Sequence, residues 1–278
     1  MSDATQEAAD EAGRLGRRAE DSDAMDVVAK VGLVAYGIVH LLLGWLAIQL
    51  AFGHTNKNAS TTGAMHELAG QPFGIALVWA IAVGMFLLVV WRVVEALFGH
   101  RDAEGGDRVR KRLMSAVKAV LYGAIGLSAV KVAVGAGSSS SGGTKGMTAK
   151  VLDWPAGQWL VAGAGLVIIG YGIALIVRGW TEQFTESLDT SGLVGTSGAA
   201  YVVLGKVGYI AKGLAIGAVG GLFVLAGIDH DSSKSGGLDQ ALQRVLQAPG
   251  GPVLLVLIGV GFACYGLFCF ARSRHLDR

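Results

Sequence analysis

The chain has 278 residues, of which 52% are hydrophobic and only 16% are charged, and its formal net charge is +2. Soluble domains carry about 25% charged residues, so this composition argues against a disordered chain and favours a protein that crosses a membrane several times. The 43 glycines follow no Gly-X-Y period, which excludes collagen, and the small net charge argues against nucleic acid as a partner.

Residues 1–29 are polar and contain no apolar stretch typical of a signal peptide, so we expect a disordered cytoplasmic tail. Six apolar stretches follow, and each approaches the roughly 20 residues that a helix needs to cross a bilayer. None of them alternates with period two, which excludes β-barrel strands. The expected spans are residues 31–52, 73–91, 115–136, 157–177, 207–228 and 251–271.

Lysine and arginine are distributed unevenly between the two ends of these spans. The side that holds both chain termini carries sixteen of them, and the opposite side carries five. Because cytoplasmic segments are enriched in these residues, we expect both termini to lie in the cytoplasm.

The six spans form three helix-pair repeats, over residues 30–99, 112–179 and 205–272. In each repeat a loop rich in Gly, Ser and Thr follows the first span, and a Pro-x-Gly triplet precedes the second. Counting along the repeats also aligns individual residues within the spans. The aligned sets are Tyr36, Tyr122 and Lys212; Leu88, Tyr171 and Tyr265; and Glu95, Arg178 and Arg272.

The Pro-x-Gly triplets predict corners at which the chain re-enters the membrane. Short amphipathic segments precede them, at residues 65–69, 147–152 and 238–246, and suit helices that lie in the outer interface. Proline then begins the return helix in its first turn, where its missing N–H costs nothing. The corner residues are Pro72, Gly74, Pro155, Gly157, Pro249 and Gly251.

The repeat plan, the corners and runs such as residues 171–184 resemble the bacterial membrane proteins built from three copies of the domain of unknown function number 1206. The resemblance covers about residues 30–274. It implies one pair of transmembrane helices per copy, in the inner membrane of a bacterium, and no activity. Because each copy has an even number of spans, all three share one orientation. We therefore expect an all-α membrane protein whose six transmembrane helices form three parallel two-helix repeats around a pseudo-threefold axis.

Small residues should mark the helix contacts, because they allow close backbone approach in lipid. In the fifth span, Gly213, Gly217 and Gly221 recur every four residues and predict one packing ridge. After the fourth span, apolar residues recur at helical spacing and predict an amphipathic helix at the cytoplasmic interface. The residues of that helix are Arg178, Trp180, Phe184 and Leu188.

Ionisable residues inside a membrane mark functional sites by default. His40 lies in the middle of the first span, where it could bind a ligand, relay a proton or simply pack. Lys131 lies towards the outer end of the third span and can extend its ammonium group to the interface. Glu95 lies at the cytoplasmic end of the second span beside Arg92, which suggests an interfacial ion pair. His40, Lys131 and Glu95 are therefore candidate binding residues.

The outer loops contain residue types that bind metals, namely His54, His66, Asp229, His230 and Asp231. His54 and His230 both follow shortly after the first span of their repeat, so packing of the repeats could bring them together. The set lacks a tight spacing such as HExxH, and solvated loop residues are the competing interpretation.

Residues 195–198 read Gly-Thr-Ser-Gly, like the GxSG of rhomboid proteases, but Ser197 precedes the fifth span and the sixth span has no histidine before His275. We therefore expect no catalytic residues and no cofactor. The leading hypothesis is a non-enzymatic envelope accessory protein that binds membrane lipid or another membrane protein. The alternative is a small-solute transporter or channel that uses the centre of the bundle.

Overall fold

The computed structural model describes residues 23–53, 60–98, 105–135, 140–188 and 195–275. Six long helices in these ranges are apolar enough to cross a membrane, which confirms the prediction of an all-α, multi-span membrane protein. They are α2 (Asp23–Ala51), α4 (Gly74–Phe98), α5 (Gly105–Ala133), α7 (Gly157–Trp180), α8 (Gly195–Ile228) and α10 (Gly251–Arg274). α2 begins inside the segment that we expected to be a disordered tail.

Short helices connect the two long helices of each repeat, at the places where the sequence predicts amphipathic segments. They are α3 (Thr61–Ala69), α6 (Ser140–Leu152) and α9 (Leu238–Gln247). In α9 the buried residues are Asp239, Ala241 and Leu242, so one face of this helix packs on the bundle. Two short 3-10 helices, η1 (Gln183–Ser187) and η3 (Ser232–Lys234), complete the described elements.

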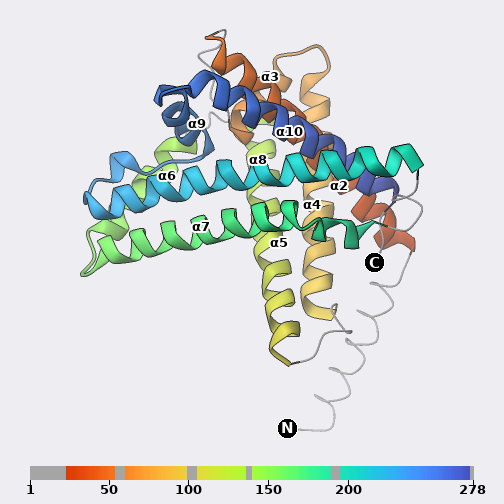
Figure 1. Cartoon of the computed structure of the whole chain (residues 1–278), viewed down its shortest axis with the longest axis horizontal. Helices are drawn as coiled ribbons and strands as arrows, with labels where there is room; N and C mark the ends of the chain where they lie inside the picture. The colour runs from red at the N-terminus through yellow and green to blue at the C-terminus, as the bar shows by residue number, and fades with distance from the viewer. Residues whose placement is uncertain (1–22, 54–59, 99–104, 136–139, 189–194, 276–278) are drawn as a thin grey trace.

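The most extensive helix contacts join α7 to α8, α10 to α2 and α4 to α5. In each case the second helix of one repeat packs on the first helix of the next repeat, and α10 returns to α2. Figure 1 shows α7 and α8 side by side along the horizontal of the view, and α4 and α5 along the vertical. The contacts thus follow the repeats in cyclic order, while the pseudo-threefold axis stays a prediction.

Glycines that recur every seven residues bring α7 and α8 together in an antiparallel pair. A methyl group at Gly172 would lie 2.7 Å from the carbonyl oxygen of Gly213. Similarly, a methyl group at Gly165 would lie 2.7 Å from the carbonyl oxygen of Gly220. The backbones are therefore too close to accept any side chain at these positions.

The predicted ridge on α8 is only partly right, because a methyl group at Gly172 would lie 2.9 Å from the backbone nitrogen of Gly217 but the contact does not include Gly221. A methyl group at Gly217 or Gly221 would meet no atom within 4 Å, whereas one at Gly220 or Gly227 would meet the backbone of α7. The glycines at which the contact leaves no room for a side chain are Gly213, Gly220 and Gly227. The physical reason is that two helices crossing at a small angle face each other every seven residues, or two turns, so a row of every fourth residue drifts off the contact.

The α10–α2 pair repeats this design. A methyl group at Gly266 would lie 2.7 Å from the carbonyl oxygen of Gly37, and one at Gly44 would lie 2.5 Å from that of Gly259. At two of the four corresponding positions of the third pair, α4 carries Val89 and α5 carries Val130, while the other two keep the small residues Ala82 and Gly123. The contact between α4 and α5 is accordingly less extensive than the other two.

The second repeat differs from its neighbours because its own two helices do not pack closely. In repeats 1 and 3 the helices of one repeat also contact each other through small residues, whereas α5 and α7 form no extensive contact within the described ranges. Larger residues, Lys118, Leu121 and Val167, replace the small ones in repeat 2. The small residues are Gly32, Ala35 and Gly84 in repeat 1, and Gly208, Ala211 and Gly261 in repeat 3.

The Pro-x-Gly corners share one backbone geometry. The middle residue has a left-handed φ in all three, at 61° for Phe73, 63° for Ala156 and 72° for Gly250. The amide of each following glycine donates to the carbonyl oxygen of the residue before proline, at 2.8, 2.9 and 2.8 Å. These are the features of a type II turn, in which proline at the second position fixes φ.

The glycine, rather than the proline, begins each return helix, so the expectation that proline opens the helix is wrong. α4, α7 and α10 start at Gly74, Gly157 and Gly251. A methyl group at Gly157 would lie 2.9 Å from the carbonyl carbon of Val151, and the other two glycines are equally close to the preceding short helix. Glycine is therefore required because the return helix starts against the backbone of the short helix.

The connection after α7 is not the predicted amphipathic helix. α7 ends at Trp180, the backbone turns through a left-handed Glu182, and η1 follows. Phe184 is fully buried between Tyr209 and Phe268, with ring centroids at 5.3 and 5.1 Å. The segment therefore folds onto the bundle through Phe184 instead of presenting a continuous apolar stripe to the membrane.

We predict opposite effects for two alanine substitutions on α7. Gly172→Ala places a methyl group on the backbone of α8 and should cost about 1–3 kcal/mol of unfolding free energy through overpacking. Gly170→Ala is the matched control, since a methyl group there meets nothing within 4 Å. It should stabilise the helix by up to about 1 kcal/mol. Thermal unfolding in detergent, followed by circular dichroism, checks this, and equal shifts of the two midpoints would contradict the glycine contact.

We also predict that exchanging alanine and glycine at the middle position of two corners shifts the thermal unfolding midpoint in opposite directions. Ala156→Gly relieves a left-handed alanine and should raise the unfolding midpoint, because that conformation costs a non-glycine residue about 1–2 kcal/mol. Gly250→Ala should lower the midpoint for the same reason. The added methyl group meets no atom within 4 Å, so a steric clash does not contribute. Midpoints that move in the same direction for both variants would be inconsistent with this turn geometry.

Candidate functional site

Residues aligned by the repeats meet at the centre of the bundle. The rings of Tyr36 on α2 and Tyr122 on α5 lie 5.0 Å apart, centroid to centroid. Lys212 on α8, the third member of the set, donates a 2.6 Å hydrogen bond from Nζ to the hydroxyl oxygen of Tyr36. The first helices of all three repeats therefore contribute one side chain each to a shared cluster.

Lys212 is partly buried, and aromatic rings surround its ammonium group. Its Nζ lies 4.1 Å from the ring centroid of Tyr265 and 4.8 Å from that of Tyr36. Ring faces attract cations electrostatically, so these contacts replace part of the hydration that the ammonium group lost. Sequence reasoning did not select Lys212, although a lysine within an apolar span, aligned with two tyrosines, was the available signal.

His40 belongs to the same cluster and is 5% exposed. Its Nδ1 lies 2.9 Å from the carbonyl oxygen of Tyr36. Because a carbonyl can only accept, Nδ1 carries the proton and donates. The ring also packs against Tyr36 and Tyr265, with centroids at 4.3 and 4.7 Å. These contacts fit the packing interpretation of His40, and its role in ligand binding or proton transfer stays a prediction.

Glu95 pairs with Arg92, so the predicted ion pair is confirmed. The hydroxyl of Ser115 on α5 also donates to Glu95 Oε2 at 3.0 Å, so this carboxylate links α4 to α5. The guanidinium of Arg92 lies 4.0 Å from the ring centroid of Trp91. Lys131, the third candidate, is exposed in the last turn of α5, in agreement with an ammonium group that extends to the interface.

A second cationic group that sequence reasoning missed lies near the C-terminal ends of the return helices. Arg92, Arg178 and Arg272, from α4, α7 and α10, each interact electrostatically with Lys118 of α5. Each arginine alone is indistinguishable from a topology-determining charge at the end of a span. Their convergence follows from the packing of the three repeats, which the sequence pattern does not specify.

The candidate metal ligands are engaged in other contacts or exposed. Asp229 pairs with Lys234 at 2.7 Å, and Asp231 accepts from the amide of Ser233 at 2.9 Å. The hydrogen bonds from Ser233 lower the pKa of Asp231. His66 and His230 are exposed. The part of the chain that the structure describes contains no group of three or more His, Cys, Asp or Glu able to hold a metal ion. His54 lies outside the described residues, so the metal hypothesis stays a prediction.

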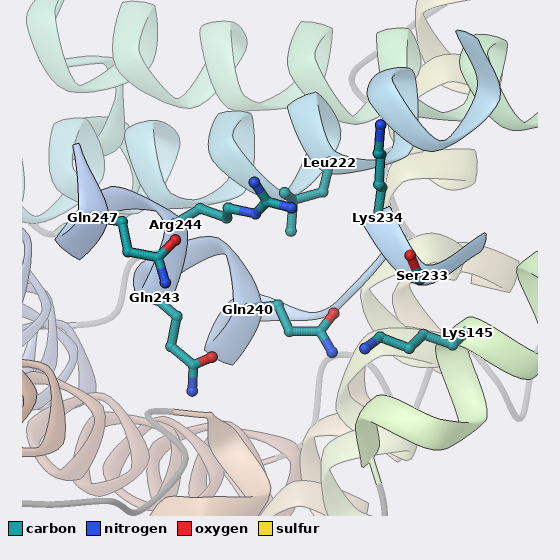
Figure 2. A pocket seen from close by; sticks show the side chains of 8 residues that line it. All are labelled: Lys145, Leu222, Ser233, Lys234, Gln240, Gln243, Arg244 and Gln247. Carbon is teal, nitrogen blue, oxygen red and sulfur yellow. The ribbon is translucent and has the colours of Figure 1, made fainter. Parts of the chain in front are cut away.

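A small polar pocket lies between α6, α8, η3 and α9, as Figure 2 shows. Its volume is about 180 Å³, below the roughly 300 Å³ at which pockets for drug-sized ligands begin. Among its lining cations, Lys234 pairs with Asp229. With its amide turned to suit both neighbours, Gln240 accepts from Lys145 Nζ at 3.2 Å. Two of the three lining cations, Lys145 and Lys234, therefore have partners within the protein.

Comparison with known proteins agrees with the repeat plan. The chain matches the family model described as Domain of Unknown Function (DUF1206) three times, over residues 31–99, 113–182 and 207–275. It is 29% identical over 250 residues to the uncharacterized protein YxxB of Bacillus subtilis (strain 168), and the match covers 88% of each chain. No solved structure matches the chain. The expected threefold match to this family is confirmed.

We predict that Tyr36 and Lys212 stabilise the protein as a pair. Tyr36→Phe removes the acceptor of the Lys212 hydrogen bond and should cost about 1–3 kcal/mol of unfolding free energy. In the double variant Tyr36→Phe, Lys212→Met no ammonium group is left without a partner, so most of that loss should be recovered. Tyr201→Phe, on the same helix as Lys212 and only partly buried, is the control. If Tyr36→Phe lowers the unfolding free energy equally with lysine and with methionine at position 212, this interpretation is wrong.

Proposed function

We propose that this chain, which belongs to the family defined by the Domain of Unknown Function (DUF1206), is a non-enzymatic membrane protein that binds a membrane lipid. The observation that carries the proposal is the construction of the bundle centre. Tyr36, Tyr122, Tyr265 and His40 pack there against one another, and the ammonium group of Lys212 lies against the rings of Tyr36 and Tyr265. A centre filled by aromatic side chains suits a scaffold that presents binding surfaces towards the bilayer better than a pathway through it.

The outer surface of the long helices supports a lipid as the ligand. Large apolar side chains are exposed along the spans, among them Val120 at 72%, Val167 at 73% and Leu166 at 62%. Acyl chains solvate such side chains in a bilayer, so a specific lipid needs in addition only a polar group that recognises its headgroup. We propose the inner membrane of a bacterium as the location, with both termini in the cytoplasm, because of the distribution of Lys and Arg.

Native mass spectrometry of the full chain, purified in a mild detergent, tests lipid binding. We expect a lipid at fixed stoichiometry that survives collision energies at which loosely bound surrounding lipids dissociate. A bare chain at all energies would contradict lipid binding, and a chain that instead carries a second protein would point to an assembly role.

Transport is the second candidate, and the presence of His40 and Lys212 within spans is the observation that favours it. Reconstituted liposomes with a proton gradient and a broad solute panel distinguish the two functions. If the protein only binds lipid, liposomes that contain it should show the same flux as empty liposomes. Flux that requires the protein, that His40→Ala abolishes and that the exposed control His66→Ala leaves intact would establish transport instead.

A further inference from the structure

Three arginines in the C-terminal halves of the return helices contain buried nitrogen atoms without a hydrogen-bond partner. These atoms are the Nε of Arg92, Arg178 and Arg272. Arg92 is only 4% exposed as a whole residue. An unsatisfied buried donor is costly, and more so when it is charged. A helix dipole explains a cation in the last turn of a helix, as for Arg178 and Arg272, but it explains neither Arg92, which lies before the last turn of α4, nor a buried donor without a partner.

The arginines and Lys118 form a common cationic cluster. Arg92, Arg178 and Arg272 all interact electrostatically with Lys118, and Tyr122 interacts with Arg92 and Arg272. The carboxylate near them, Glu95, already accepts from Arg92 and Ser115. Three guanidinium groups beside one engaged carboxylate repel one another, so an added anion that accepts from their other N–H groups would remove the repulsion.

Repeat 2 leaves one side of this cluster next to lipid. Lys118 occupies the position at which Gly32 and Gly208 allow the helices of the other repeats to pack. Next to it on α5, Leu121 is 47% exposed, and on α7 Val167 is 73% exposed. The contact that covers the corresponding residues in repeats 1 and 3 is missing between α5 and α7 within the described ranges, so Leu121 and Val167 stay exposed.

We propose that Arg92, Lys118, Arg178 and Arg272 bind the phosphate of an anionic lipid whose acyl chains lie against α5 and α7. This inference rests on the proposed function and specifies the chemical class of its ligand. Guanidinium groups suit phosphate because their planar N–H donors bind two oxygens at once.

The test is a lipid titration of the full-length protein in detergent, read by native mass spectrometry and by the thermal unfolding midpoint. Phosphatidylglycerol is compared with diacylglycerol of the same acyl chains, which lacks the phosphate, and with inorganic phosphate. The variant Arg178→Gln, Arg272→Gln removes two of the cluster cations. The control Arg110→Gln, Arg274→Gln removes the same charge from two exposed arginines, one of them in the same last turn as Arg272.

We expect phosphatidylglycerol to bind at fixed stoichiometry and to raise the midpoint of the wild type. The cluster variant should lose about tenfold or more in affinity, because charged hydrogen bonds are lost, and the control less than about threefold. Without lipid the cluster variant should unfold at no lower temperature than the wild type, which separates loss of binding from loss of folding.

Three outcomes would overturn the inference and leave lipid binding intact. They are equal phosphatidylglycerol affinity of the cluster variant and the control, equal binding of diacylglycerol, and stabilisation by inorganic phosphate that matches that of the lipid. Failure of every lipid class to bind the wild type would overturn the proposed function itself.

Discussion

Close contact between glycine backbones is the interaction on which the rest of this structure depends. Lipid tails are as apolar as leucine, so burying apolar side chains between helices gains little free energy in a bilayer, and helices associate through dispersion contacts at short range. The α7–α8 and α10–α2 pairs reach this range along glycines spaced by seven residues. Two of the three most extensive helix contacts therefore need no polar partner to hold them.

The polar cluster at the centre follows from the same contacts. Tyr36, Tyr122 and Lys212 each precede a glycine of the first helix of their repeat. Where that glycine lets the neighbouring helix approach, as at Gly37 and Gly213, the adjacent larger side chain turns towards the shared interior. The glycine thus sets the distance between the backbones, and the side chain of the residue before it occupies the interior beside the contact.

The sequence was sufficient for features that depend on local order along the chain. Apolar length predicts the six spans, and the recurrence of Pro-x-Gly predicts the corners, because both are properties of one segment. It was insufficient where two segments must be compared in space. Gly220 and Gly221 are equally plausible packing residues on a single helix, and only the partner helix selects between them. The cluster of Arg92, Arg178 and Arg272 was missed for the same reason, since three ends of three helices meet only after packing.

The return of α10 to α2 has a consequence for how such a chain can be divided. Each repeat carries a first helix that fits the preceding repeat and a second helix that fits the following one, and the two interfaces are different surfaces. Such head-to-tail contacts close when the rotation between copies allows it, whether or not the copies share a chain. The contacts between the copies close the ring by themselves. Covalent linkage has a different effect: it lets one copy carry Lys118 where the other two carry glycine. Three identical subunits would have to change that position together, and the chain is free to be asymmetric because its repeats are joined.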